Sequence, residues 1–111
     1  MAAVAARSSL IGALLRTATP VNTSAAFTFL RGLSRDELAC IAEFHGACML
    51  EASHGLNKSP YRLLPFFFDS GASDRWRDPD DRAHKTFVVL AWLEYLENRP
   101  VLVHSSPQAT V

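Results

Sequence analysis

The segment from Asp78 to Arg99, DPDDRAHKTFVVLAWLEYLENR, has middle turns that are almost wholly apolar. Asp78 is a favoured helix N-cap, Pro79 suits the first helical position, and Pro100 ends the pattern. The sequence therefore predicts a helix over residues 79–98. Because this helix has so narrow a polar face, other parts of the chain or another molecule must cover it.

A second helix is predicted over residues 35–54. Ser34 and Glu37 match a capping box at its start, and Gly55 suits a left-handed cap at its end. One flank of this helix carries the small residues Ala39, Ala42, Gly46 and Ser53. A glycine inside a helix costs roughly 1 kcal/mol relative to alanine. We expect the 79–98 helix to pack closely against this flank, which would explain the glycine.

Residues 56–78 break the helical periodicity, since they contain two prolines and a turn signal at Asp69-Ser70-Gly71. They are nevertheless rich in aromatic residues. We expect an irregular connector that folds back over the helix pair and presents the run Phe66–Phe68 outward. Residues 101–104 suit a short edge strand or an extended arm, and 104–111 a frayed tail. The expected fold is mainly α, a small two-helix, antiparallel, hairpin-like domain with a long aromatic-rich irregular connector and extended termini.

Residues 1–33 have the composition of an organellar targeting segment. They are rich in Ala, Ser and Thr and contain Arg7, Arg16 and Arg31 but no acidic residue. A mitochondrial destination is predicted, with the chloroplast as the alternative. Arg31-Gly32-Leu33-Ser34 resembles a mitochondrial processing junction. The same residues also begin the predicted helical domain, 34–111, so the sequence leaves open whether 1–33 are removed.

The charge of the chain argues against nucleic acid as a partner. All eleven acidic residues follow Ser34, whereas three of the eleven basic residues precede it, so residues 34–111 are net acidic. Binding to phosphate draws on clustered Lys and Arg. The longest apolar helical run, Thr86–Leu93, falls well short of the roughly 20 residues of a membrane-spanning helix. Contact with a membrane is therefore expected to be peripheral at most.

Few residues of the sequence suggest a catalytic or metal-binding site. His45 and Cys48 are three residues apart on one helix face and are the best candidate metal ligands, but structural zinc requires four converging ligands. Small buried cysteines and a core histidine are the simpler interpretation. The sequence contains no glycine-rich phosphate loop, nucleophile elbow or Ser–His–Asp motif. We therefore predict no enzyme activity, no catalytic residue and no cofactor.

The size and apolar surface of the predicted domain indicate that it binds other proteins. A domain as small as residues 34–111, with no evident disulfide or metal and much apolar surface, is expected to bury that surface against other proteins. The function predicted is a non-catalytic accessory subunit of a large mitochondrial inner-membrane assembly, a respiratory-chain or ATP-synthase complex. The alternatives are a mitochondrial ribosome accessory protein and a small matrix metal-binding protein or enzyme using His45 and Cys48. The predicted partner-binding residues are Phe66, Phe67, Phe68, Trp76, Trp92 and Tyr95.

Overall fold

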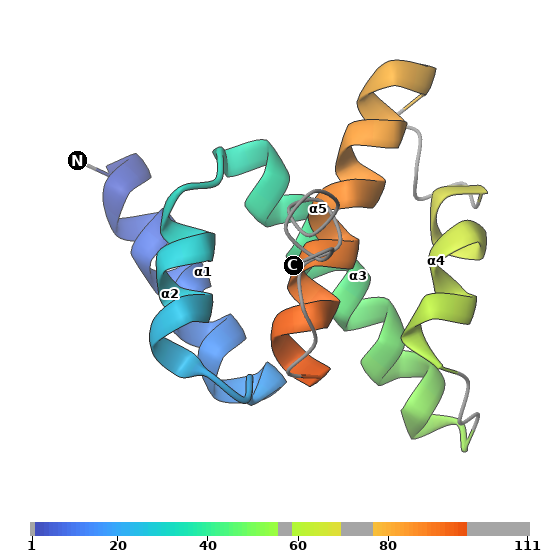
Figure 1. Ribbon diagram of the computed structural model, residues 1–111, viewed down its shortest axis with the longest axis horizontal. Coiled ribbons are helices and arrows are strands. Elements are labelled where there is room, and N and C mark those ends of the chain that lie inside the picture. The colour runs from blue at the N-terminus through green and yellow to red at the C-terminus, as the bar shows by residue number, and fades with distance from the viewer. Residues whose placement is uncertain (1, 56–58, 70–76, 98–111) are drawn as a thin grey trace, which may run out of the picture.

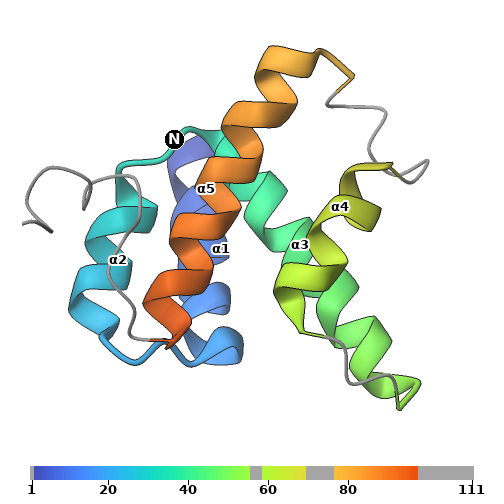
Figure 2. The ribbon, with the colours of Figure 1, turned by 45° about the vertical axis from the view of Figure 1, so that its right-hand side comes forward.

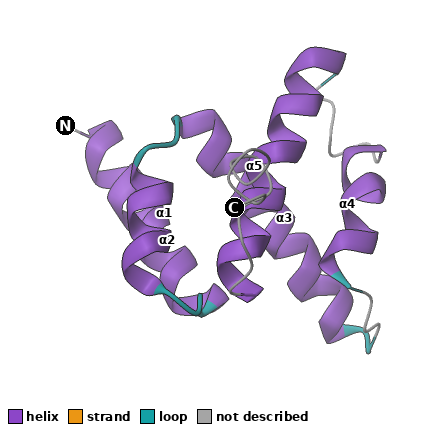
Figure 3. Ribbon diagram, in the orientation of Figure 1, coloured by secondary structure: helices purple, strands orange, loops and turns teal. Residues whose placement is uncertain are grey.

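The computed structural model describes residues 2–55, 59–69 and 77–97. Within these ranges the chain forms helices joined by short turns, with no strand (Figure 3). The predicted two-helix domain is therefore wrong, although the all-helical class is correct. Trp76, the 101–104 arm and the 104–111 tail lie outside the described residues. The described residues form α1 (Ala2–Ala18), α2 (Thr23–Arg31), α3 (Arg35–Ser53), α4 (Pro60–Asp69) and α5 (Pro79–Glu97).

Helices α3 and α5 are the two that the sequence predicts, and their capping signals are confirmed. The Ser34 hydroxyl accepts a hydrogen bond from the Glu37 backbone N–H (3.1 Å), and the Glu37 carboxylate accepts one from the Ser34 N–H (2.7 Å). Gly55 follows α3 with φ +77°, a conformation that favours glycine. The Asp78 carboxylate caps α5 by accepting from the Asp81 N–H (2.9 Å).

The connector is not irregular throughout, because residues 60–69 form α4. Ser59 starts this helix, since its hydroxyl accepts from the Tyr61 N–H (3.2 Å) and its carbonyl from the Arg62 N–H (2.9 Å). Pro60 occupies the first helical position, where no donor is needed. Pro65 lies inside the helix. The two prolines that suggested an interruption are thus accommodated, one as a helix start and one internally.

Burial explains why Pro65 is tolerated. An interior proline costs about 3 kcal/mol, because it removes one backbone donor and crowds the preceding turn. Burying an aliphatic or aromatic side chain contributes roughly 1.5–3 kcal/mol. Four such side chains on α4 outweigh the proline, and they are Leu63, Leu64, Phe67 and Phe68.

Most of residues 2–31 are also helical, and α1 and α2 contribute to the same core. Ile11 and Leu14 of α1 and Ala26 and Leu30 of α2 are buried, the last two completely. Helix α1 contacts α2 and α3, and α2 contacts α5. The predicted targeting segment is therefore also part of the packed structure, and α2 supplies part of the cover that α5 requires.

The arrangement places α3 and α5 between the α1–α2 pair and α4 (Figures 1 and 2). Helix α5 contacts α2, α3 and α4, so most of its circumference lies against this chain. The largest completely buried side chains come from α2, α3 and α5 and include Trp92, Phe44, Leu30, Leu38 and Ile41. One core thus extends through the described part of the chain.

The expected close approach at Gly46 does not occur. Gly46 is exposed, and a Cβ added there would have no neighbour within 4 Å. Toward the end of α3, Met49 and Leu50 are exposed at 52% and 58%. Helix α5 crosses the first half of α3 instead, where Leu38, Ile41 and Phe44 are buried. Nothing in the packing explains the glycine.

Candidate functional site

The first candidate is a charged cluster that joins the starts of α3 and α5. Lys85, only 4% exposed, donates to Asp36 (2.8 Å) and to Asp81 (2.7 Å). The neighbouring His84 Nε2 pairs with the Glu37 carboxylate. Burial of the Lys85 ammonium acts to lower its pKa, but the hydrogen bonds and charges of the two aspartates prevail and raise it. Lys85 therefore stays protonated and tethers the two helices.

The two cysteines of α3 have raised thiol pKa values. Burial of Cys40 raises the pKa of its thiol to about 12, and burial of Cys48 raises its thiol to about 11. Because the thiolate is the nucleophile and the metal ligand, neither side chain is activated at neutral pH. Both cysteines are free thiols. The cluster therefore has the properties of a structural tether rather than of a reactive centre.

The predicted metal ligands do not acquire a ligand set. His45 is half-buried, and its burial lowers the pKa of the imidazole. Over residues 2–55, 59–69 and 77–97, no group of three or more His, Cys, Asp or Glu side chains is positioned to hold a metal ion. His45 and Cys48 thus offer two ligands at most there, fewer than structural zinc uses.

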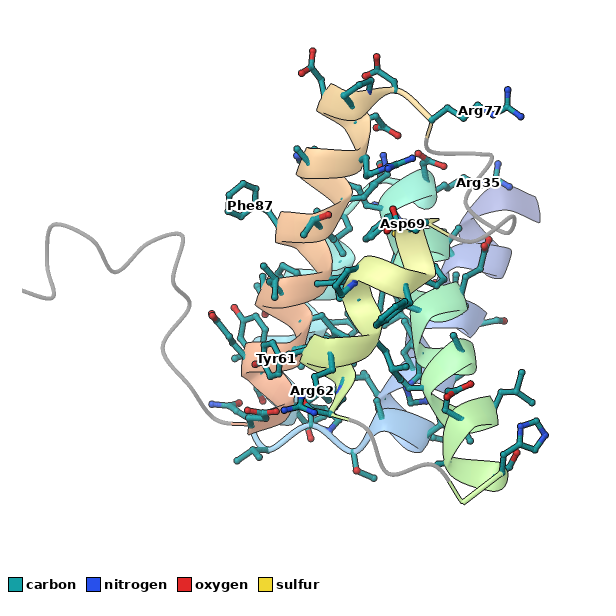
Figure 4. All side chains as sticks on the ribbon, turned by 90° about the vertical axis from the view of Figure 1, so that its right-hand side faces the viewer. Arg35, Tyr61, Arg62, Asp69, Arg77 and Phe87 are labelled. Atoms are coloured by element: carbon teal, nitrogen blue, oxygen red, sulfur yellow. The ribbon has the colours of Figure 1, made fainter. Side chains whose placement is uncertain are left out.

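The second candidate is a groove of about 370 Å³ between α4 and α5. One rim is polar, where the Arg82 guanidinium lies 3.6 Å from the Asp69 carboxylate. Most of the lining is apolar or uncharged, and it comprises Tyr61, Leu64, Pro65, Phe68, Asp69, Arg82 and Thr86. Figure 4 shows α4 with Tyr61 and Asp69 at its two ends and α5 beside it.

The structure divides the predicted partner-binding residues. Phe67 and Phe68 are buried, with the Phe67 ring 5.4 Å from the Phe44 ring, and Trp92 is 1% exposed. Tyr95 is half-buried against Phe29, at a ring distance of 5.0 Å. Of the three consecutive phenylalanines only Phe66 faces outward, at 65% exposure. A partner could contact Phe67, Phe68 and Trp92 only if this fold opened.

The sequence prediction missed Phe87, which is 58% exposed and extends away from the body of the protein (Figure 4). A signal for this was present in the helical spacing. Phe87 falls on the same face of α5 as Asp80, Ala83 and His84, and all three are exposed. Because Phe87 stands within the apolar run of α5, its place on the polar face of the helix was overlooked. Phe66 and Phe87 each directly follow a residue that lines the α4–α5 groove, Pro65 and Thr86 respectively.

No helix in the described ranges has both the length and the apolar character needed to cross a bilayer. No protein-family model matches the chain. No curated protein and no solved structure matches it either.

Proposed function

We propose that this protein is a non-catalytic accessory subunit of a large mitochondrial inner-membrane assembly, a respiratory-chain or ATP-synthase complex. We further propose that it binds a neighbouring subunit through the α4–α5 face, defined as Phe66, Phe87 and the groove between these helices. The observation that carries the binding face is the exposure of two phenylalanines, 65% and 58%, on the two helices that line one groove.

Exposed aromatic side chains favour the binding of a partner, because binding removes them from water. A phenylalanine left in water forgoes the roughly 1.5–3 kcal/mol that burial of such a side chain contributes. Aromatic anchors near a pocket are the typical energetic centre of protein–protein interfaces. Phe66 and Phe87 would act as anchors, and the groove would receive an apolar side chain of the partner. The Asp69–Arg82 pair would supply the polar rim.

The mitochondrial destination rests on the composition of residues 1–33, which hold three arginines and no acid. We propose that this segment directs import and then stays in the mature chain. Leu14, Ala26 and Leu30 support retention, because their removal would uncover the core residues of α3 and α5 beneath them. Arg7 adds a second tie, since its Nη2 donates to the Arg31 carbonyl (3.3 Å) and to the Leu33 carbonyl, at the end of α2.

The interface is tested by affinity purification from mitochondria, comparing the wild type with the double variant Phe66→Ser/Phe87→Ser. The matched control is Met49→Ser/Leu50→Ser, which removes two exposed apolar side chains at the far end of α3. We expect the first variant to lose the co-purifying subunits while its circular dichroism and melting stay unchanged, and the control to retain them. The proposal would be overturned if both double variants recovered the partner subunits equally. It would also be overturned if no subunit of an inner-membrane complex co-purified with the wild type.

Retention is tested separately by the intact mass of the endogenous protein from purified mitochondria. A mass that includes α1 and α2 supports it. A chain that begins at Ser34 contradicts retention while leaving import intact. Absence of the protein from purified mitochondria contradicts the destination itself.

A further inference from the structure

A second groove, of about 490 Å³, runs between α1 and α2 on a part of the molecule that the proposed interface does not use. Figure 1 shows these two helices side by side, on the opposite side of α3 and α5 from α4. Both helices contribute to the lining, which consists of Arg7, Ser8, Ile11, Gly12, Leu15, Phe27 and Arg31. The volume lies in the range of roughly 300–1,000 Å³ that is usual for small-molecule sites.

The groove combines an apolar surface with positive charge at one end. Ile11, Leu15 and the 42% exposed Phe27 provide the apolar part. Arg7 reaches from α1 to the last turn of α2, where its Nη2 donates to the Arg31 carbonyl (3.3 Å). Arg31 is itself one of the residues that line the groove. Two arginines from different helices therefore meet at the same end of the groove.

A third arginine, Arg16, does not line the groove but lies next to one of its lining residues. Arg16 Nη1 is 3.4 Å from the position that a Cβ on Gly12 would occupy, and Gly12 lines the groove. The sequence places no acidic residue among positions 1–33, so neither helix carries a carboxylate to neutralise these charges. A guanidinium group has five N–H donors in a planar fork, and the two bonds that Arg7 makes to backbone carbonyls use only one of its nitrogens.

We infer that this groove binds one single-chain anionic amphiphile of the long-chain fatty-acid class. The carboxylate would be held by Arg31 and Arg7, because guanidinium and carboxylate form short charge-assisted hydrogen bonds. The acyl chain would lie over Ile11, Leu15 and Phe27, where each methylene removed from water adds to affinity. A groove lined by only two helices suits one chain rather than the two of a phospholipid.

The probe is dodecanoate at concentrations below micelle formation, titrated into the full-length protein by isothermal calorimetry. We expect saturable binding at one site, and no comparable binding of dodecyltrimethylammonium, which has the same tail and the opposite charge. Arg31→Gln should weaken dodecanoate binding about tenfold or more, as the loss of a charge-assisted hydrogen bond predicts. The matched control is Arg35→Gln, an exposed arginine on α3 outside the groove, and it should bind as the wild type does.

Phe27→Ser provides a second variant on the apolar side and should also weaken dodecanoate binding, with melting measured to show that the fold is kept. The proposal is overturned if dodecanoate does not saturate, if the cationic detergent binds equally well, or if Arg31→Gln and Arg35→Gln lose equal affinity. Binding confined to anionic phospholipid vesicles would also overturn it, since that result would assign the arginines to a membrane surface rather than to a groove.

Discussion

Lys85 Nζ lies 2.8 Å from Asp36 Oδ2 and joins the first turn of α3 to the second turn of α5. The lysine is almost completely buried, whereas the aspartate side chain is 53% exposed. The ammonium is therefore the group that depends on its partners, because water can still solvate the carboxylate. Asp81, one turn earlier on α5, completes the site at 2.7 Å.

Replacement of Lys85 by methionine should destabilise the protein by roughly 1.5–3 kcal/mol, the range for hydrogen bonds to charged groups, while keeping the apolar stem. Arg82→Met is the matched control, since its pair with Asp69 is longer (3.6 Å) and its side chain is 38% exposed. That change should cost about 0–1 kcal/mol. Urea denaturation at pH 7 measures both free energies, and equal costs would contradict the tether.

The same lysine should limit stability at alkaline pH. Its two aspartate partners raise its pKa in the folded state against the opposing effect of burial. A raised lysine pKa contributes stability that is fully present below the unfolded value, about 10.4, and is lost as pH rises through the folded value. The urea midpoint should therefore fall above about pH 10.4 in the wild type. The fall should be smaller in Lys85→Met, and a parallel fall in both would exclude this lysine as its source.

Glu37 should contribute at the acid end. Burial acts to raise its pKa, but the hydrogen bonds from the Ser34 backbone and from His84 outweigh it and lower the pKa from 4.5. A lowered carboxyl pKa contributes stability above the unfolded value, and this is lost as pH falls through the folded one. Below pH 4.5 the melting temperature of the wild type should drop more steeply than that of Glu37→Gln. Glu51→Gln, near the other end of α3, should follow the wild type.

Trp92 should be the most costly single position to truncate. Trp92→Ala removes the largest completely buried side chain and should cost about 3–5 kcal/mol. Among the described residues its buried Nε1 has no hydrogen-bond partner, so its contribution is packing. Trp92→Phe should therefore cost clearly less than Trp92→Ala. Phe87→Ala, at an exposed site on the same helix, should be near neutral in the same chemical denaturation series.

Gly46→Ala should stabilise the protein by up to about 1 kcal/mol, because the position is helical, exposed and has space for a Cβ. Gly55→Ala should do the opposite, since its φ of +77° strains any side chain. Thermal melts of the two variants would thus move in opposite directions. A destabilising Gly46→Ala would indicate that the exposed flank of α3 is covered by something in solution.

The helix ends at α3 and α5 were predictable because capping is local. Ser34, Glu37 and Asp78 bond to backbone groups within three residues of themselves, and Gly55 adopts its left-handed conformation next to the helix it follows. Helix α4 was not predictable in this way. From the local sequence, Pro60 and Pro65 predict an interruption of the helix. Only the burial of side chains such as Phe67 and Phe68 against the rest of the chain outweighs the energetic cost of Pro65.

The candidate sites likewise combine features that residue types predict with features that depend on helix packing. Residue types alone identified the aromatic run, but which of its members stay exposed, and the groove between α4 and α5, depend on how these helices pack. The three N-terminal arginines are evident in the sequence, whereas the meeting of Arg7 and Arg31 at one groove depends on α1 lying against α2.

The amino-acid sequence alone predicts the helical class, the starts of α3 and α5, and the separation of an acid-free N-terminal third from an acidic remainder. The contribution of α1 and α2 to the core, and the burial or exposure of each aromatic side chain, depend on the packing of the helices. This difference arises from the distance along the chain over which each interaction acts. Caps and charge composition act within one turn or sum along the chain, whereas burial is settled by which helix lies against which.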